Sequence, residues 1–144
     1  MNLFFDTSAL VKLFSTEAGS EQVKKLIADP NHKIWVSELA AIEIFCAIYR
    51  KARSNQIPYS NVDKILHAIE KQFEAFVIIP LASGVVEEAK LLLKKFGQDH
   101  GLRTLDALHL ASFKQMAEPN WQFVSSDRNQ VNVSKELKLN PLFI

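Results

Sequence analysis

At 144 residues, with 48% hydrophobic and 23% charged residues, this chain has the size and composition of one globular domain with a substantial core. Its formal net charge of +1 gives no general electrostatic reason to expect nucleic-acid binding, and it does not exclude a local basic patch. A single cysteine, Cys46, excludes an internal disulfide, and no Cys and His residues share zinc-site spacing.

No apolar run approaches the ~18 residues that a membrane-spanning helix requires. The amino-terminal segment enters an apolar strand pattern directly, without the basic region and cleavage site of a secretory signal. With four Gly, five Pro and no repeat or low-complexity segment, the chain also shows no interdomain linker. We therefore expect a single domain over 1–144, located in the cytoplasm and without a membrane partner.

The first predicted element is a buried strand, Leu3–Phe5, which ends at the carboxylate of Asp6. Apolar residues between Leu10 and Phe14 then recur at helical spacing, so a tight turn should lead into a helix. Ligands of parallel α/β sheets bind at the carboxyl ends of the strands, where Asp6 would lie. Further elements are predicted as helices over 20–28, 37–53, 60–75, 84–96, from 104 onward and near 133–138, and as strands over 34–36, 76–79, 121–124 and 141–144.

Local signals define the ends and inner faces of several of these helices. Ser37, Ser83 and Thr104 are expected to be N-caps, and Gly97 and Gly101 should bracket a polar loop. The apolar side chains expected to face the core are Leu39, Ile42, Phe45, Cys46 and Tyr49 of helix 37–53, together with Trp35 and Trp121.

The alternation of strands and helices predicts a parallel sheet covered by helices on both faces, a three-layer α/β/α sandwich. Four carboxylates stand out in this arrangement. Asp6 and Asp127 each follow a buried strand, Asp106 opens a nearly all-apolar helix, and Glu43 interrupts an apolar helical stripe. Each has an ordinary structural alternative: Asp6 and Asp127 as helix caps, Asp106 as an acid favoured by the helix dipole, and Glu43 as half of a buried ion pair.

Taken together, the four acids favour a different interpretation. Carboxylates directed at one crevice repel one another unless a cation lies among them. Oxygen-only ligands suit Mg²⁺ or Mn²⁺ rather than zinc. A hard divalent ion in such a site orients water and polarises phosphate, so phosphoryl chemistry is the expected reaction class.

Four segments resemble the PIN-domain ribonucleases, and most closely the VapC-like toxins of toxin–antitoxin pairs. These segments are Leu3-Phe4-Phe5-Asp6-Thr7-Ser8-Ala9-Leu10, Val36-Ser37-Glu38-Leu39-Ala40-Ala41-Ile42-Glu43, Leu102-Arg103-Thr104-Leu105-Asp106-Ala107-Leu108-His109-Leu110-Ala111 and Phe123-Val124-Ser125-Ser126-Asp127. The resemblance extends over almost the whole chain, and the four segments follow one another in the order of that family. The resemblance implies a sheet of about five parallel strands and hydrolysis of RNA phosphodiester bonds with Mg²⁺ or Mn²⁺. It also implies a small antitoxin partner and a homodimer.

The same resemblance assigns roles to individual residues. Asp6 and Asp106 would be the direct metal ligands, Glu43 would act through a water on the metal or as the base, and Asp127 would complete the site or hold a second ion. Ser8 and Ser126 match hydroxyl positions that orient a carboxylate or contact phosphate.

The basic residues near these acids have more than one interpretation. Arg103 could bind RNA phosphate or neutralise the acidic cluster, and His109 could approach Asp106 but is better explained as a structural histidine. Further candidates for RNA contact, although charge clusters at helix ends are usually just solvated, are Arg50, Lys51, Arg53, Lys94 and Lys95.

Other functions stay open beside the toxin nuclease. They are a free-standing RNA-processing nuclease, a PIN-like module that binds RNA or protein without cutting, and a phosphatase or phosphoryl-transfer receiver. The last lacks support, because Asp6-Thr7-Ser8 has no second Asp and no Lys ends a late strand.

Overall fold

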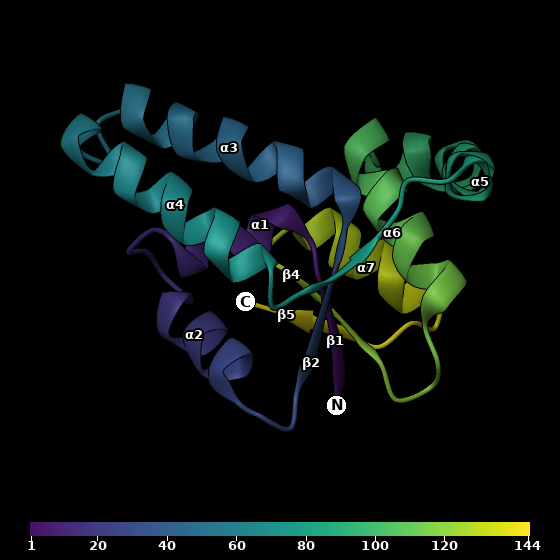
Figure 1. Ribbon diagram of the computed structural model, residues 1–144. Coiled ribbons are helices and arrows are strands. Elements are labelled where there is room, and N and C mark those ends of the chain that lie inside the picture. Colours follow the sequence, from purple (N-terminus) through teal and green to yellow (C-terminus); the bar gives the residue numbers. More distant parts are fainter.

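A computed structural model describes residues 1–144 as a five-stranded parallel sheet between two layers of helices (Figure 1). The strands lie in the order β3-β2-β1-β4-β5. Their bounds are β1 Asn2–Phe5, β2 Lys33–Ser37, β3 Val77–Ile79, β4 Gln122–Ser125 and β5 Pro141–Phe143. The predicted three-layer sandwich of about five parallel strands is confirmed.

The helices occupy the connections between the strands. Their bounds are α1 Thr7–Leu10, α2 Ser20–Ala28, α3 Glu38–Arg53, α4 Val62–Phe73, α5 Ser83–His100, α6 Thr104–Met116 and α7 Arg128–Glu136, with short 3-10 helices at Val11–Leu13 and Tyr59–Asn61. No helix combines the length and the apolar character that crossing a bilayer would require.

The alternation of side chains along β1 explains the two helical layers. Leu3 and Phe5 point to one face of the sheet, where they belong to a core shared with α1, α2, α3 and α4. Phe4 points to the opposite face and packs with the core residues of α5 and α6. Each of these three side chains is fully buried, so the central strand is apolar on both faces, as a parallel sheet requires.

The register of the central strands brings the carboxyl ends of three strands to one edge of the sheet. Phe5 pairs with Val36 of β2 and with Val124 of β4, so these strands end side by side. The backbone N–H of Asp6 continues the ladder by donating to the Val124 carbonyl at 3.1 Å. The residue after β1 therefore lies beside the end of β4.

Two helix boundaries differ from the predictions for reasons of capping. α5 continues through Gly97 to His100, and it ends at Gly101, whose left-handed φ of 61° suits a helix C-terminus, so the predicted loop over 97–101 is wrong. α7 begins five residues before the predicted Val133, because the side chain of Asp127 accepts hydrogen bonds from the first-turn amides and caps the helix there.

The serine and threonine caps were predicted with mixed success. Ser37 caps α3 as expected, with its hydroxyl oxygen accepting from the Leu39 amide at 3.2 Å. Ser83 and Thr104 are instead the first residues inside α5 and α6, which begin without a side-chain cap. Ser83 and Thr104 are therefore not the predicted caps.

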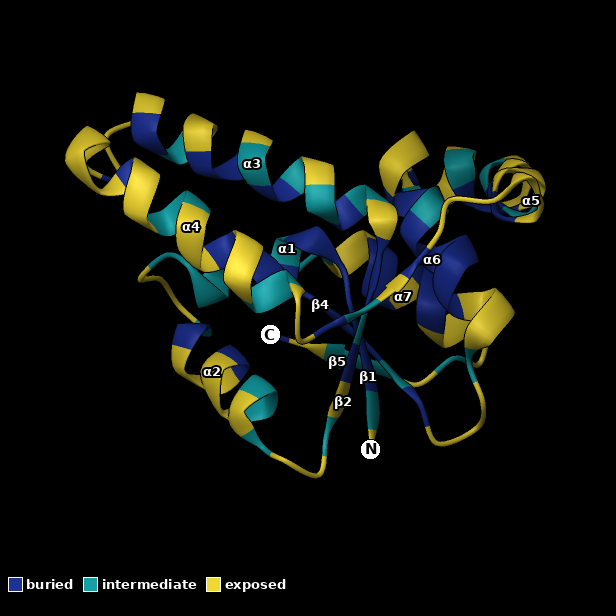
Figure 2. Ribbon diagram, in the orientation of Figure 1, coloured by how far each residue is buried: buried dark blue, intermediate teal, exposed yellow.

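The predicted inner face of α3 is correct only in part: Phe45 packs against the core as expected, but three other predicted residues do not. Ile42 and Tyr49 are 64% and 45% exposed, and Cys46 is exposed as well. Figure 2 shows α3 with exposed stretches along one side and buried stretches along the other. The residues that face the core are Ala40, Ile44, Ala47, Ile48 and Ala52. Three of these are alanines, which let the helix pack closely. Because α3 has apolar residues on two sides, the spacing of apolar residues alone does not identify the side that faces the core.

Two side chains of the sheet are less buried than those of the central strand. Ile78 of β3 is 45% exposed, because this strand lies at the edge of the sheet rather than in its centre. Trp121 is buried as expected, whereas Trp35, which packs against it at 4.5 Å between ring centroids, is only half-buried.

Candidate active site

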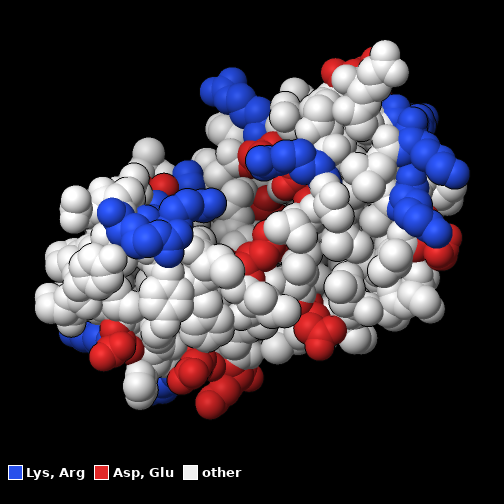
Figure 3. Space-filling view, turned by 90° about the horizontal axis from the view of Figure 1, so that it is seen from above, with Lys and Arg blue, Asp and Glu red and all other residues white.

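A pocket of about 420 Å³ opens at the carboxyl edge of the central strands. All four predicted acids line it, from four different segments of the chain: Asp6, Glu43, Asp106 and Asp127. Seen from above the sheet, acidic side chains occupy a hollow that Lys and Arg side chains flank (Figure 3). The fold therefore gathers the acids into one crevice, where ligands of parallel α/β sheets bind.

Asp6 is the most heavily hydrogen-bonded of these acids, and it is 1% exposed. Its carboxylate accepts from the Ala9 amide at 3.0 Å, which caps α1, and from the Ser8 and Ser125 hydroxyls at 2.8 Å. Burial raises the pKa of Asp6, and the nearby His109 and these hydrogen bonds offset that rise only in part. Asp6 is thus both a helix cap and a pocket acid.

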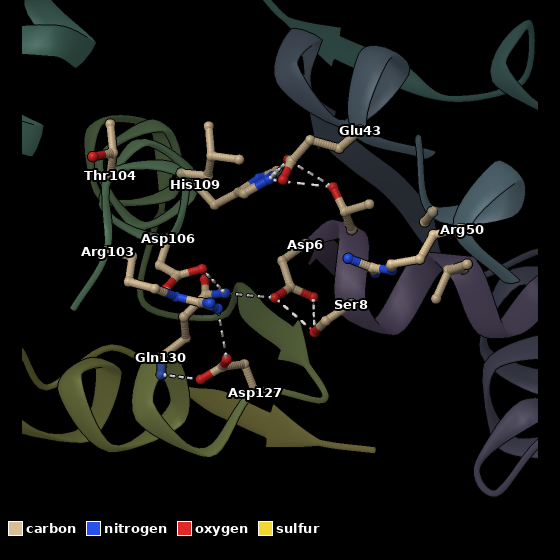
Figure 4. A pocket seen from close by; sticks show the side chains of 14 residues that line it. Asp6, Ser8, Glu43, Arg50, Arg103, Thr104, Asp106, His109, Asp127 and Gln130 are labelled. Atoms are coloured by element: carbon tan, nitrogen blue, oxygen red, sulfur yellow. Dashed lines mark hydrogen bonds and ion pairs between the residues drawn. The ribbon is translucent and has the colours of Figure 1, made fainter. Parts of the chain in front are cut away.

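Asp106 and Asp127 share a basic neighbour. The Arg103 Nε donates to Asp106 Oδ2 at 3.2 Å, and Arg103 Nη2 lies 3.9 Å from Asp127 Oδ2 (Figure 4). Arg103 is 76% exposed, so the guanidinium covers the two acids from the solvent side. Of its two interpretations, the neutralising one is present in this structure.

Glu43 reaches the pocket from α3 and meets a histidine from α6. His109 Nε2 donates to Glu43 Oε1, and the Thr7 hydroxyl donates to the same oxygen at 2.9 Å. Burial by itself would raise the pKa of Glu43, but the hydrogen bonds from His109 and Thr7 outweigh it, so the pKa is lowered. Glu43 is therefore held as a carboxylate, with Oε2 free of these contacts.

His109 does not approach Asp106, three residues before it on α6. It is 2% exposed and its partner is Glu43, 66 residues away in the sequence. The interpretation as a structural histidine holds in that its ring is buried and hydrogen-bonded, but the group that it holds is a pocket acid.

Of the two predicted hydroxyl residues, Ser8 contacts Asp6 and Ser126 does not; its neighbour Ser125 makes that contact instead. Ser8 donates to Asp6, as expected, and accepts from the Ser126 backbone amide at 2.9 Å. The second hydroxyl that orients Asp6 belongs to Ser125, the last residue of β4, while the Ser126 hydroxyl is buried without a partner. The sequence has two adjacent serines here. Successive side chains of a strand point in opposite directions, so only one of the two serines can face Asp6.

Gln130 was missed in the sequence. Its side chain is 3% exposed, and its amide nitrogen donates to Asp6 at 2.9 Å and to Asp106 at 3.2 Å. Recognising it would have required the correct start of α7, because a helix that begins at Arg128 places Gln130 in its first turn beside Asp127. Thr7, which follows Asp6 directly, was likewise not assigned a role.

The basic candidates separate into one that lines the pocket and four that do not. Arg50, in the last turn of α3, directs its guanidinium into the pocket toward Asp6 (Figure 4) and forms no ion pair. Lys51 instead pairs with Glu17 at 2.8 Å. Away from the pocket lie Lys51, Arg53, Lys94 and Lys95.

The donor set suits a hard divalent ion that keeps most of its waters. Three acidic, His or Cys side chains do not converge closely enough to enclose an ion by themselves. Asp6 and Asp106, however, both bind the single amide nitrogen of Gln130, which keeps one oxygen of each close together. Mg²⁺ commonly takes one or two protein carboxylates and completes its shell with water, so these two residues fit it.

Comparison with known proteins agrees with the fold. The family model described as PIN domain matches residues 3–136. The chain belongs to the PIN-domain family. The resemblance carried by the four acidic segments is thereby confirmed.

Two relatives of this PIN domain are named Ribonuclease VapC45 and Ribonuclease VapC49, both from Mycobacterium tuberculosis (strains CDC 1551 / Oshkosh and ATCC 25618 / H37Rv). Each is 31% identical over 126 residues, covering 88% of this chain and 84% of the relative.

Solved structures share the fold at low sequence identity. M. tuberculosis VapC20, described as a Sarcin-Ricin loop cleaving toxin, matches with a TM-score of 0.67 at 16% identity, over 89% of this chain and 92% of that one. VapBC2 from Rickettsia felis, bound to a DNA fragment from its promoter, matches with a TM-score of 0.64 at 16% identity, over 100% and 99% of the chains.

Proposed function

We propose that this PIN domain is a divalent-metal-dependent endoribonuclease and the toxin of a toxin–antitoxin pair. The observation that carries the proposal is the single pocket lined by Asp6, Glu43, Asp106 and Asp127, in a chain whose 31% identical relatives are named ribonucleases. The substrate is RNA, and the reaction is hydrolysis of a phosphodiester bond.

Asp6 and Asp106 would hold Mg²⁺ or Mn²⁺, because their carboxylates are the pair that the fold keeps together. When bound, the ion would supply positive charge that polarises the phosphodiester and acidifies a water molecule. Asp127 would complete the site or hold a second ion from its position beside Arg103.

Glu43 is assigned the role of proton acceptor. Its Oε1 is engaged by His109 and Thr7, whereas Oε2 is free to accept a proton from the attacking water. The lowered pKa of Glu43 keeps the group ionised at neutral pH, the state that a base needs. Ser8 and Ser125 orient Asp6, and the Ser126 backbone amide orients Ser8.

The proposal is tested by incubating total cellular RNA with the purified chain in Mg²⁺, in Mn²⁺ and in EDTA. We expect discrete fragments that require the metal and disappear in Asp6→Asn prepared identically. Metal-independent cleavage, or equal cleavage by Asp6→Asn, would refute the assigned site. If the chain binds RNA but cuts under none of these conditions, it is either a non-cleaving module or a nuclease with a very narrow target. Growth arrest on expression that Asp6→Asn relieves would identify the narrow target.

Partners follow from the same proposal. A solved structure described as a toxin–antitoxin complex from Klebsiella pneumoniae shares the fold, with a TM-score of 0.59 at 18% identity, over 87% of this chain and 86% of that one. We infer a small antitoxin that neutralises this chain in the cytoplasm, and a homodimer of the toxin itself. A small gene immediately upstream whose product co-purifies with the chain would support the toxin; its absence would favour a free-standing RNA-processing nuclease.

Replacing Arg50 with alanine should weaken RNA binding. Its unpaired guanidinium faces the acids from the opposite side to Arg103, where it can bind a phosphate next to the scissile one. We expect KM to rise about three- to tenfold with kcat little changed, and the slope of log(kcat/KM) against log[salt] to fall in magnitude by about 0.7, the value for one contact to single-stranded nucleic acid.

Arg53→Ala is the matched control for Arg50→Ala, since Arg53 is an exposed arginine of the same helical end that does not line the pocket. Equal effects of the two substitutions would mean that only general charge matters and would contradict a phosphate contact at Arg50.

Metal binding should weaken as the pH falls, because of Asp6. A pKa raised above the unfolded value means that Asp6 stabilises the metal-free fold below its unfolded pKa and that this contribution is lost as the pH rises through the folded pKa. A divalent ion displaces the proton, so Mn²⁺ should raise Tm more at about pH 8 than at about pH 5. Thermal unfolding with and without Mn²⁺ measures this, and an identical pH dependence in Asp6→Asn would contradict it.

A further inference from the structure

The amide group of Gln130 lies between the two acids proposed to bind the metal. Its nitrogen donates to Asp6 Oδ2 at 2.9 Å and to Asp106 Oδ1 at 3.2 Å, so both N–H bonds of one amide are used on two carboxylates (Figure 4). These acids follow β1 and open α6, and Gln130 comes from a third element, α7. One neutral side chain thus links segments that are far apart in the sequence.

The orientation of this amide follows from chemistry. An ionised carboxylate accepts hydrogen bonds and donates none. The amide nitrogen must therefore face Asp6 and Asp106, and the amide oxygen must point away. That oxygen, Gln130 Oε1, is buried and has no hydrogen-bond partner. An unsatisfied buried acceptor destabilises a fold, so Gln130 is a poor choice for packing alone, and its two bonds to the acids account for its presence.

Asp127 fixes the position of Gln130. The Asp127 carboxylate accepts from the backbone amides of Asn129 at 2.8 Å and Gln130 at 3.0 Å, which caps α7 and anchors its first turn. The side chain of Gln130 then extends from a fixed backbone into a site where it is 3% exposed. A buried side chain on an anchored helix end can impose a separation on the groups that it binds.

We propose that Gln130 is a positioning residue that holds Asp6 and Asp106 at the separation a divalent cation needs, before any cation arrives. The proposal rests on the proposed function, in which these two acids are the direct ligands. The amide supplies partial positive charge between two carboxylates that would otherwise repel each other and turn apart. The divalent ion then finds its two protein ligands already oriented, which is the role of the groups that hydrogen-bond to metal ligands in metalloproteins.

The test is Mn²⁺ affinity of the full chain, measured by calorimetric titration, in Gln130→Met and in Gln22→Met. Methionine matches the size of glutamine but donates no hydrogen bond. The same substitution at Gln22, an exposed glutamine of α2, is the control. We expect Gln130→Met to weaken Mn²⁺ binding by about tenfold or more and to lower the metal-free Tm, because the two carboxylates lose their shared donor, and Gln22→Met to leave both unchanged.

Gln130→Glu provides a second variant that keeps the length of the side chain. It places a third carboxylate against Asp6 and Asp106, so the metal-free Tm should fall and Mn²⁺ should raise Tm by more than in wild type. An unchanged metal-free Tm in this variant would show that the amide does not offset repulsion between the acids.

The remaining outcomes separate the two proposals. Wild-type Mn²⁺ affinity in Gln130→Met would overturn the positioning role, and tighter binding would show that the amide competes with the ion instead. In both cases, metal-dependent cleavage by the wild-type chain would leave the proposed function standing. A wild-type chain that binds no Mn²⁺ and cuts no RNA would overturn the proposed function, and the role of Gln130 with it.

Discussion

Asp106→Asn should abolish RNA cleavage, lowering kcat/KM by about a thousandfold or more, while the metal-free fold stays as stable as wild type or becomes more stable. Asparagine keeps the shape of the side chain in the first turn of α6, so the packing of this buried helix is preserved. It removes one of two carboxylates that share the Gln130 amide, which relieves their repulsion. It also removes a charge that the proposed metal requires.

Two measurements check this prediction. Cleavage is followed with a fixed RNA in Mg²⁺ and Mn²⁺, and stability by thermal unfolding in EDTA. Asp99→Asn is the matched control, because Asp99 is an exposed acid of α5 outside the pocket and should behave as wild type in both. A large drop in the Tm of Asp106→Asn without metal would indicate that Asp106 serves the fold, through Arg103, rather than the reaction.

The predicted fold depended on features that are local in the sequence. Short apolar runs that end at Asp6 and Asp127 identified two neighbouring strands, and the register of β1 with β4 brings the ends of those strands together. The two interpretations of these acids were not exclusive. Each caps the helix that follows it and each also lines the pocket, because the carboxyl end of a strand and the start of the next helix are the same place.

The residues that sequence reasoning missed depend on contacts between distant segments. The partner of Glu43 is His109, and helical spacing on α6 could only relate His109 to near neighbours such as Asp106. Gln130 could not be assigned while α7 was expected to begin at Val133. Part of the inner face of α3 was mispredicted for a different reason. Three alanines contribute to it, and a ranking by hydrophobicity places Ile42 above them although the smaller side chains are the buried ones.

Glu43→Gln should reduce kcat by about 10²- to 10⁴-fold, the usual contribution of a general base, with Mn²⁺ affinity within a few-fold of wild type. Glutamine retains an oxygen that can accept from His109 and Thr7, so the side chain can stay in place, but it cannot take a proton. This separates Glu43 from Asp6 and Asp106, whose replacement should impair metal binding and catalysis together.

Single-turnover cleavage and calorimetric titration with Mn²⁺ are the measurements for Glu43→Gln. Glu70→Gln, at an exposed site of α4 outside the pocket, is the matched control and should cleave RNA at the wild-type rate. Because the pKa of Glu43 is lowered, protonation of this group should not slow the wild-type enzyme until the pH falls below the range in which carboxylates ordinarily titrate. Loss of Mn²⁺ binding in Glu43→Gln would contradict the role of base and make Glu43 a direct ligand, which would place the ion nearer to His109 than the pair of Asp6 and Asp106 implies.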